Sequence, residues 1–449
     1  MDCQTFEAIA GGEGMEVFLK GAKSQDEGWL ACGQSFGAMN LGDAWMAKFD
    51  EAGDLIWEYL HPLGGLETFW DVVELPSGEW VALGSSQPPG PVGVVSGKMF
   101  KLSPQGELMA EVTFSQEDAV NLRVLQRDFD GGFIALGWQA TDDGGNEAVL
   151  YALDASFNVV EVVAWGEGNT RATAIVPDGN NGWFVAGNDP SMAGDNTDTW
   201  ILYHLNSNFD VLGQIAHPIS SVSALNGLDL VGSDLLLSGA DRNENNEWRS
   251  GVARIPVDLS SVDWLSSDLA SAHASGVYSP TATATGWSIG YGQNPQTGQY
   301  QPYMQAYSQD FEWASEVQWI PIDEQQAVVY DIVEHEGLLG LVGQAMLENQ
   351  NAQGWLKVLD TPSYITERPS NTEWPAAYPN PTRGLVWLKC PSEGGLEWSD
   401  QQGKLVGEDV VPLGNGWFDL RRLPTGVYHV RLVTGQDQAP VQTVVFSAN

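Results

Sequence analysis

The hexapeptide GWLACG at residues 28–33 returns in altered form six more times along the chain. The copies share a short apolar run that ends in glycine, and five of the seven contain an aromatic residue. They are EWVALG (79–84), GFIALG (132–137), GWFVAG (182–187), DLLLSG (234–239), GWSIGYG (286–292) and GLLGLVG (337–343). Successive final glycines lie 51, 53, 50, 52, 53 and 51 residues apart, so residues 1–365 form seven copies of one unit.

Each unit predicts four short β-strands. An apolar strand and a tight turn, such as Pro-Ser-Gly at 76–78, precede the glycine run, and a polar loop and a hairpin, such as DAWMAKFDEAGDLIWEY at 43–59, follow it. Four-stranded units repeated radially are the blades of a β-propeller, whereas a linear solenoid uses shorter repeats and polar caps. The sequence therefore predicts an all-β protein with a seven-bladed β-propeller over 1–365.

The two ends of the repeat region complement each other. The seventh unit lacks a good fourth strand, and TFEAIAGG at 5–12 resembles a fourth strand that precedes the first unit. We expect residues 5–12 to complete the last blade, because this pairing leaves no unpaired edge in the ring.

The repeat resembles the secreted β-propeller repeats of Bacteroidetes, which read approximately D-x-W-x-x-K-x-D-x-x-G-x-x-x-W and D-G-G-x-x-x-x-G. Residues 43–57, 198–210 and 130–137 carry the matching pattern. The resemblance implies the fold and gives no activity, since propellers host many unrelated functions.

The composition changes after the repeats. The polar, proline-containing segment TERPSNTEWPAA at 366–377 predicts a linker. Residues 378–449 hold six Lys or Arg and seven Asp or Glu, although the whole chain has a net charge of −40. Short alternating strands with glycine turns predict a small immunoglobulin-like β-sandwich there.

This tail resembles the C-terminal sorting domain of the type IX secretion system. The residues that carry the resemblance are Tyr378, Pro379, Asn380, Pro381, Gly384, Gly403, Gly426 and Tyr428. It implies a translocon and a sorting peptidase as partners, and a protein that is secreted or held on the outer-membrane surface. The stretch MDCQTFEAIAGGEG at the start lacks the pattern of a signal peptide, so, if the protein is exported, we take the chain to be a mature form or one that has lost its signal.

Charge and composition exclude several classes of partner. A net charge of −40 disfavours nucleic acid and anionic membranes, and no apolar run is long enough to predict a transmembrane segment. Cys3, Cys32 and Cys390 are too few and too scattered for a disulfide framework or a zinc site. GWSIG at 286–290 matches a nucleophile motif, but it lies within a predicted strand and lacks the helix that the motif requires.

The variable loops between the second and third strands of each unit are the expected place for a ligand. They combine aromatic side chains with oxygen acceptors, and the candidate ligand-binding residues are Trp138, Asp143, Asp195, Asp198, Asp241 and Trp248. Asp195 with Asp198, or Asp142 with Asp143, could ligate calcium, although neither pair forms a complete calcium loop. We expect no other cofactor. The recurring Trp29, Trp80, Phe133, Trp183 and Trp287 are expected to pack between blades.

Three functions fit these observations. The sequence favours a secreted or cell-surface binding or adhesion protein without catalytic activity, whose propeller binds an extracellular glycan or protein. An alternative is a secreted glycan-active hydrolase or lyase with its site in the propeller funnel, and a second alternative is a passive surface-coat component. The first is preferred because no carboxylate pair or histidine cluster recurs at a site-like spacing.

Overall fold

The computed structural model describes most of the repeat region and parts of the tail. The described residues are 5–12, 14–37, 42–61, 65–88, 94–114, 119–142, 144–166, 169–189, 199–218, 224–243, 245, 247–269, 271–278, 286–308, 310–335, 338–347, 351–360, 385–387, 395–400, 404–406, 410–414, 417–419, 426–433 and 438–446. The chain divides into two compact units, Met1–Ser363 and Tyr364–Asn449.

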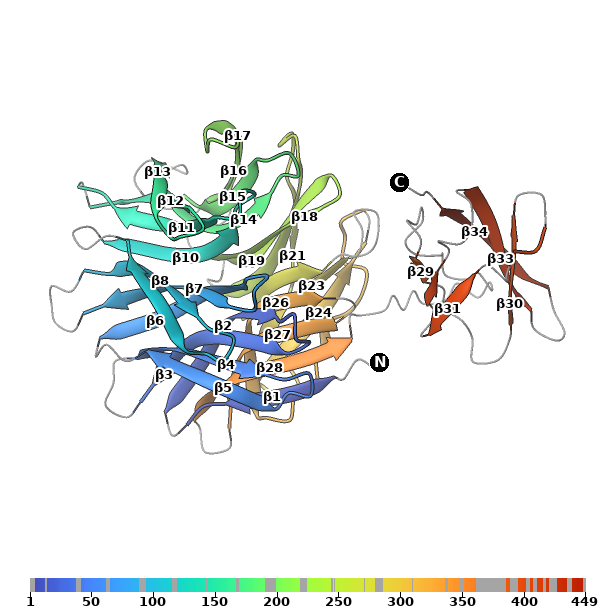
Figure 1. Ribbon diagram of the computed structural model, residues 1–449, viewed down its shortest axis with the longest axis horizontal. Coiled ribbons are helices and arrows are strands. Elements are labelled where there is room, and N and C mark those ends of the chain that lie inside the picture. Colours follow the sequence, from blue (N-terminus) through green and yellow to red (C-terminus); the bar gives the residue numbers. More distant parts are fainter. Residues whose placement is uncertain are drawn as a thin grey trace. The chain divides into compact units, whose positions relative to one another are not determined.

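The first unit is a ring of seven four-stranded antiparallel sheets (Figure 1). The first strand of each sheet contacts the first strands of both neighbouring sheets, which closes the ring around its axis. The predicted seven-bladed β-propeller is therefore confirmed.

The strands of the seven sheets occupy four positions from the axis outward. The inner strands are β2 (Met15–Lys23), β6 (Leu66–Glu74), β10 (Val120–Arg127), β14 (Arg171–Pro177), β18 (Ala224–Val231), β22 (His273–Tyr278) and β26 (Gln326–His335). The second strands are β3 (Trp29–Phe36), β7 (Trp80–Gln87), β11 (Phe133–Ala140), β15 (Trp183–Asn188), β19 (Asp234–Arg242), β23 (Gly286–Gln293) and β27 (Leu338–Met346). The third strands are β4 (Asp43–Phe49), β8 (Ser96–Leu102), β12 (Asn146–Leu153), β16 (Thr199–Leu205), β20 (Trp248–Pro256), β24 (Tyr300–Tyr307) and β28 (Ala352–Asp360). The outer strands are β5 (Leu55–His61), β9 (Leu108–Thr113), β13 (Val159–Trp165), β17 (Val211–Pro218), β21 (Asp263–Ser266), β25 (Gln318–Trp319) and β1 (Phe6–Ala10).

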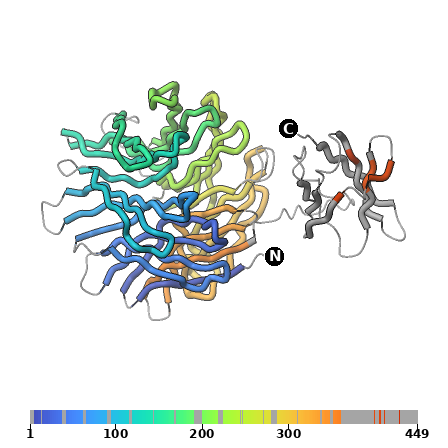
Figure 2. The backbone as a smooth tube through the Cα atoms, in the orientation of Figure 1, coloured from blue at the N-terminus to red at the C-terminus, as the bar shows by residue number. Residues whose placement is uncertain are grey.

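The seventh sheet is built from both ends of the repeat region. Strand β1 pairs with β28, from Phe6 opposite Val358 to Ala10 opposite Gly354, and Figure 2 shows the two segments side by side. Glu7 of β1 accepts a hydrogen bond from Trp355 Nε1 at 2.7 Å and forms an ion pair with Lys357 at 2.5 Å. These contacts hold the sheet together over 348 residues of sequence separation.

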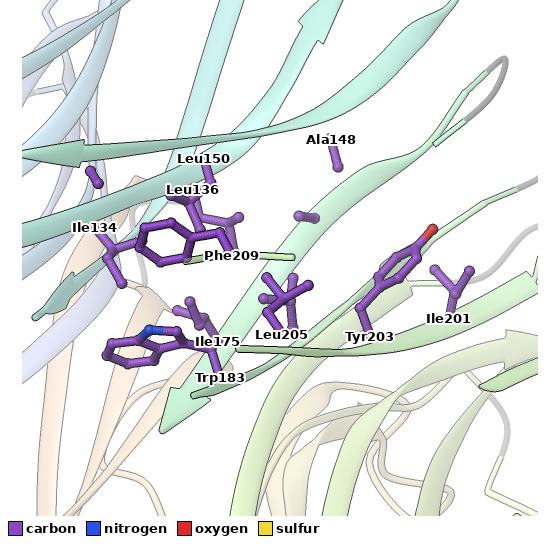
Figure 3. Close-up of a cluster of buried hydrophobic side chains, with 13 residues drawn as sticks. Ile134, Leu136, Ala148, Leu150, Ile175, Trp183, Ile201, Tyr203, Leu205 and Phe209 are labelled. Atoms are coloured by element: carbon purple, nitrogen blue, oxygen red, sulfur yellow. The ribbon is translucent and has the colours of Figure 1, made fainter. Parts of the chain in front are cut away.

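The cores lie between neighbouring sheets. Middle strands such as β4 are buried on both faces, which explains their uninterrupted apolar runs. Figure 3 shows one core, in which Trp183 and Ile175 of the fourth sheet pack against Ile134 and Leu150 of the third.

Most of the recurring aromatic residues fill these cores as expected. Trp29, Trp80, Phe133 and Trp183 are at most 2% exposed. Trp287 is also buried, but it lies one position later in its strand, so it faces the other side of its sheet. The first position there is Gly286, and the ring of Tyr307 occupies the space beside it.

The repeated glycine lies against the inner strand in every sheet. A Cβ atom on it would lie 1.8 to 2.6 Å from a carbonyl oxygen of that strand, far inside contact distance. The seven glycines are Gly33, Gly84, Gly137, Gly187, Gly239, Gly290 and Gly343. The sixth is therefore Gly290 and not Gly292, which corrects the spacing inferred from the sequence.

A β-bulge in the inner strand lies directly beside each glycine. In the third sheet Leu122 pairs with Gly137 and Val124 pairs with Leu136, so Arg123 has no opposite residue. The other six sheets repeat this arrangement. Bulges bend a strand and redirect a side chain, and here the glycine leaves room for the bend.

The described part of the second unit contains two three-stranded sheets. One has the order β29 (Leu385–Trp387), β32 (Trp417–Asp419), β31 (Val411–Gly414), and the other β30 (Gly395–Asp400), β33 (Gly426–Val433), β34 (Gln438–Phe446). Tyr428 is 4% exposed, and Gly426 begins the same strand. The other predicted sorting residues, Tyr378, Pro379, Asn380, Pro381, Gly384 and Gly403, lie outside the described residues. The immunoglobulin-like sandwich stays a prediction.

Replacing Gly137 with alanine should destabilise the propeller by roughly 2 to 3 kcal/mol, because its Cβ would lie 2.0 Å from the carbonyl oxygen of Asn121. Chemical denaturation measures the change. The control is Gly213→Ala on an outer strand, where the nearest atom to the new Cβ is 3.7 Å away. Equal stability of the two variants would contradict the close-contact explanation.

Candidate ligand-binding site

One face of the propeller gathers the beginnings of the inner strands and the variable loops. Antiparallel pairing places Met15, at the start of β2, opposite Phe36, at the end of β3, and the loop to β4 follows directly. The same order holds in all seven sheets. We call this face the upper face, and the turns between the first and second strands lie on the lower face.

The bulges place seven side chains around the axis. These are Leu19, Trp70, Arg123, Thr173, Asn226, Ser275 and Tyr330. Several of them contact a neighbouring inner strand. Asn226 Nδ2 donates to the carbonyl oxygen of Ala274 at 2.8 Å, and Ser275 Oγ donates to that of Val329 at 2.6 Å. Tyr330 is 38% exposed, so part of the ring is accessible to a ligand.

Two bulge residues belong to a cluster of two arginines and two tryptophans, which we call the arginine cluster. The guanidinium carbon of Arg123 lies 3.2 Å from the ring centre of Trp70 and 5.1 Å from that of Trp138. The guanidinium carbon of Arg171, at the start of β14, lies 5.6 Å from the ring centre of Trp138. The cluster therefore spans the second, third and fourth sheets.

Polar contacts fix the orientation of two members of the arginine cluster. Trp70 Nε1 donates to Ser85 Oγ at 2.8 Å, and Arg123 Nε donates to Asn121 Oδ1 at 2.9 Å. Burial and the neighbouring charge of Arg171 lower the pKa of Arg123 to about 10. The guanidinium group of Arg123 is thus still positively charged at neutral pH, and the charge of Arg171 repels it.

A second cluster, which we call the histidine cluster, spans the fifth, sixth and seventh sheets. Its members are Arg242, Trp248, His273, Tyr291 and Tyr330. The ring of His273 stacks on Tyr291 with centres 5.1 Å apart and planes 7° apart, and its centre lies 4.8 Å from that of Trp248. The guanidinium carbon of Arg242 lies 4.6 Å from the ring centre of Trp248.

The histidine cluster keeps its imidazole neutral. Burial, followed by the charge of Arg242, lowers the pKa of His273 to about 4. Asp241, beside Arg242 on β19, has a pKa raised by burial, which the charge of Arg249 partly opposes. Asp241 Oδ1 is buried and has no hydrogen-bond partner among the described residues.

A third group consists of charged side chains that come after the bulge residues on the inner strands. Lys20 lies 2.8 Å from Asp331, which also accepts a hydrogen bond from the backbone N–H of Gly21 at 3.0 Å. Burial lowers the pKa of Lys20. The carboxylates of Asp331, Asp71 and Asp229 together have a larger effect and raise the pKa above its ordinary value. Burial raises the pKa of Asp71 to about 6, although Lys20 opposes this change.

The sequence-predicted ligand residues fall into two sets. Trp138 lies in the arginine cluster, Trp248 lies in the histidine cluster, and Asp241 lies next to it. Asp143, Asp195 and Asp198 lie outside the described residues, as do most of the proposed calcium ligands. Among the residues that are described, no three His, Cys, Asp or Glu side chains form a group that could hold a metal ion.

Sequence reasoning missed the inner-strand members of both clusters. Trp70, Arg123 and Tyr330 are bulge residues, and Arg171 and His273 begin inner strands. A positional signal existed, because each bulge residue precedes its glycine by about fourteen positions. Alignment of the seven units on their glycines would have placed these side chains in one ring.

Comparison with known proteins identifies the tail. Residues 376–446 match the family described as the secretion system C-terminal sorting domain. No curated protein matches the whole chain or a part of it.

Many solved structures are similar to the chain, and three of them show the level of similarity. A protein of unknown function from Dyadobacter fermentans is 8% identical over 79% of this chain and 98% of its own, with a TM-score of 0.48. The acylaminoacyl peptidase of Pyrococcus horikoshii is 10% identical over 83% of this chain and 57% of its own (TM-score 0.45). The β-propeller domain of the Trilobed protease from Pyrococcus furiosus is 10% identical over 78% and 99% (TM-score 0.42). Similarity at this level assigns no activity.

The sorting domain establishes the fate of the chain. The protein is handled by the type IX secretion machinery and is secreted or attached to the cell surface. Within the described residues, no helix has the length and apolar character needed to cross a membrane.

The pKa of His273 should be about 4 when it is measured by NMR titration of the imidazole nitrogens. Arg242→Gln should raise it while leaving it below 6.5, since burial remains, and Arg249→Gln should leave it unchanged. Because an unfolded histidine titrates near 6.5, the folded protein should lose stability as the pH falls from 6.5 towards 4. A measured value near 6.5 would refute the buried, neutral state.

Proposed function

We propose that the propeller is an extracellular binding protein without catalytic activity and that its upper face binds a carbohydrate. The observation that carries this proposal is the pair of aromatic clusters at the start of the inner strands. Trp138 and Trp248 are both half-buried, so each combines a fixed orientation with accessible ring surface. Aromatic faces with a few well-placed polar groups are the usual composition of a small-molecule or sugar site.

The arrangement of the clusters supports a pre-formed site. Each aromatic ring lies on a strand or at a strand end, and neighbouring rings or arginines restrain it. Binding then orders few additional side chains, which lowers its entropic cost. A rigid face of this kind suits the binding of repeated sugar units. A passive coat protein would not require such a face.

The charged groups on the axis support binding over hydrolysis. A glycosidase needs two carboxyl groups that are free to face the substrate. Asp71 instead accepts backbone N–H bonds from Val72 and Leu125, each at 2.8 Å, and Asp331 is occupied by Lys20 and Gly21. Ser288 of the GWSIG motif is fully buried within β23. These residues serve the fold.

Trp138→Ala and Trp248→Ala should each weaken binding of a polysaccharide ligand by at least about fivefold, because each removes a stacking surface worth about 1 kcal/mol or more. Affinity electrophoresis against a polysaccharide panel identifies the ligand, and isothermal titration calorimetry measures the change. Phe129→Ala is the matched control, since Phe129 is 48% exposed in a turn on the lower face.

Melting temperatures of all three variants show whether the fold is retained. Loss of binding in Phe129→Ala, with normal binding in both tryptophan variants, would place the site on the lower face. Degradation of a bound polysaccharide by the purified protein would favour the hydrolase or lyase alternative.

We further propose that a sorting peptidase removes the tail within residues 366–377, whose polar, proline-containing sequence suits cleavage. The precursor, fused to a signal peptide, should be expressed in a bacterium that has a type IX system. Mass spectrometry should then find surface protein ending near residue 377, and deletion of 378–449 should abolish export. Surface protein with an intact tail would refute removal.

A further inference from the structure

The two arginines of the arginine cluster differ from the lysines of the propeller in having no acidic partner among the described residues. All six lysines of the propeller form ion pairs with carboxylates; these pairs are Lys20–Asp331, Lys23–Glu27, Lys48–Asp26, Lys98–Glu111, Lys101–Glu79 and Lys357–Glu7. Arg249 and Arg254 also lie near aspartates. Among the described residues, no carboxylate pairs with Arg123 or Arg171.

The missing partners are unexpected in a chain with 59 acidic residues and only 19 Lys and Arg. Two adjacent guanidinium groups repel each other, and the nearby charge of Arg171 makes Arg123 harder to protonate. A carboxylate beside them would remove this cost. The site instead surrounds the two cations with the rings of Trp70 and Trp138, which hold the guanidinium groups in place but leave their charge uncompensated.

We propose that Arg123 and Arg171 bind an anionic group carried on a sugar ring, so that the ligand of the upper face is an acidic polysaccharide. This inference rests on the proposed carbohydrate-binding function and names its ligand class. The N–H groups of a guanidinium bind a carboxylate or a sulfate ester through two parallel hydrogen bonds. The exposed position of Arg171 leaves its donors accessible, and Trp138 offers an adjacent face for the sugar ring.

The overall charge of the protein sharpens this inference. A protein with a net charge of −40 repels polyanions at a distance, so general electrostatic attraction cannot produce their binding. An acidic polysaccharide is retained only if it reaches a local group of unpaired cations. Added salt screens the long-range repulsion more than it screens a contact with the half-buried Arg123, so binding should persist from low to physiological ionic strength.

The experiment compares ligands that differ only in charge. Calorimetry should use polygalacturonate and its methyl ester for the carboxylate, and dextran sulfate and dextran for the sulfate ester. We expect one of the two anionic polymers to bind and its neutral counterpart to bind at least tenfold more weakly. The anionic polymer that binds identifies which group the arginines recognise.

Variants test the named residues. Arg171→Gln should weaken binding of the anionic polymer by about tenfold, and Arg171→Lys should recover only part of the affinity because it keeps the charge and loses the paired donors. Arg249→Gln, an arginine outside the cluster, should change affinity by less than twofold. Arg123→Gln should act like Arg171→Gln if its melting temperature matches that of the parent.

The outcomes separate the two proposals. Equal binding of charged and neutral polymers, or unchanged affinity in Arg171→Gln, would overturn anionic recognition and leave carbohydrate binding in place. Absence of binding to these four polymers and to every member of the wider polysaccharide panel would overturn both.

Discussion

The contact between one glycine and one carbonyl oxygen in each sheet is the constraint on which the propeller depends. At this glycine the second strand lies so close to the inner strand that no Cβ atom fits. The inner strand has a bulge at this point in all seven sheets. The bulge bends the inner strand and turns one additional side chain towards the axis. The same glycine that permits the fold therefore also allows the bulges that carry Trp70, Arg123 and Tyr330 of the candidate site.

Two of the few cations of this acidic chain join parts of the structure that lie far apart in sequence. Lys20 connects the first and seventh sheets through Asp331, and Lys357 connects β28 to Glu7 on β1. Partly buried pairs of this kind are screened less by salt than exposed pairs. Arg123 and Arg171 differ from these lysines, since their surroundings are aromatic and no carboxylate among the described residues pairs with them.

The architecture could be predicted from sequence because glycine spacing and turn residues are local signals. The seven sheets, their strand order and the sorting tail all left such signals. The sixth unit was misaligned by two residues, since GWSIGYG contains two glycines and only Gly290 lies against the inner strand. The site was found only in part. Trp138 and Trp248 were recognised as exposed aromatics, but Arg123 and His273 depend on bulges and on contacts between sheets, which periodicity within one strand does not encode.

The pairing of β1 with β28 has a consequence for the order of events during synthesis. Any nascent chain shorter than 354 residues leaves β1 without its partner, even when six sheets are already complete. Bringing these ends together costs about 5 kcal/mol of chain entropy by loop-length scaling, and the gain arrives only with the last strand. The ring can therefore close only after its last strand has been synthesised. A prematurely terminated product retains open sheet edges at both ends, where chaperones and proteases can act on it.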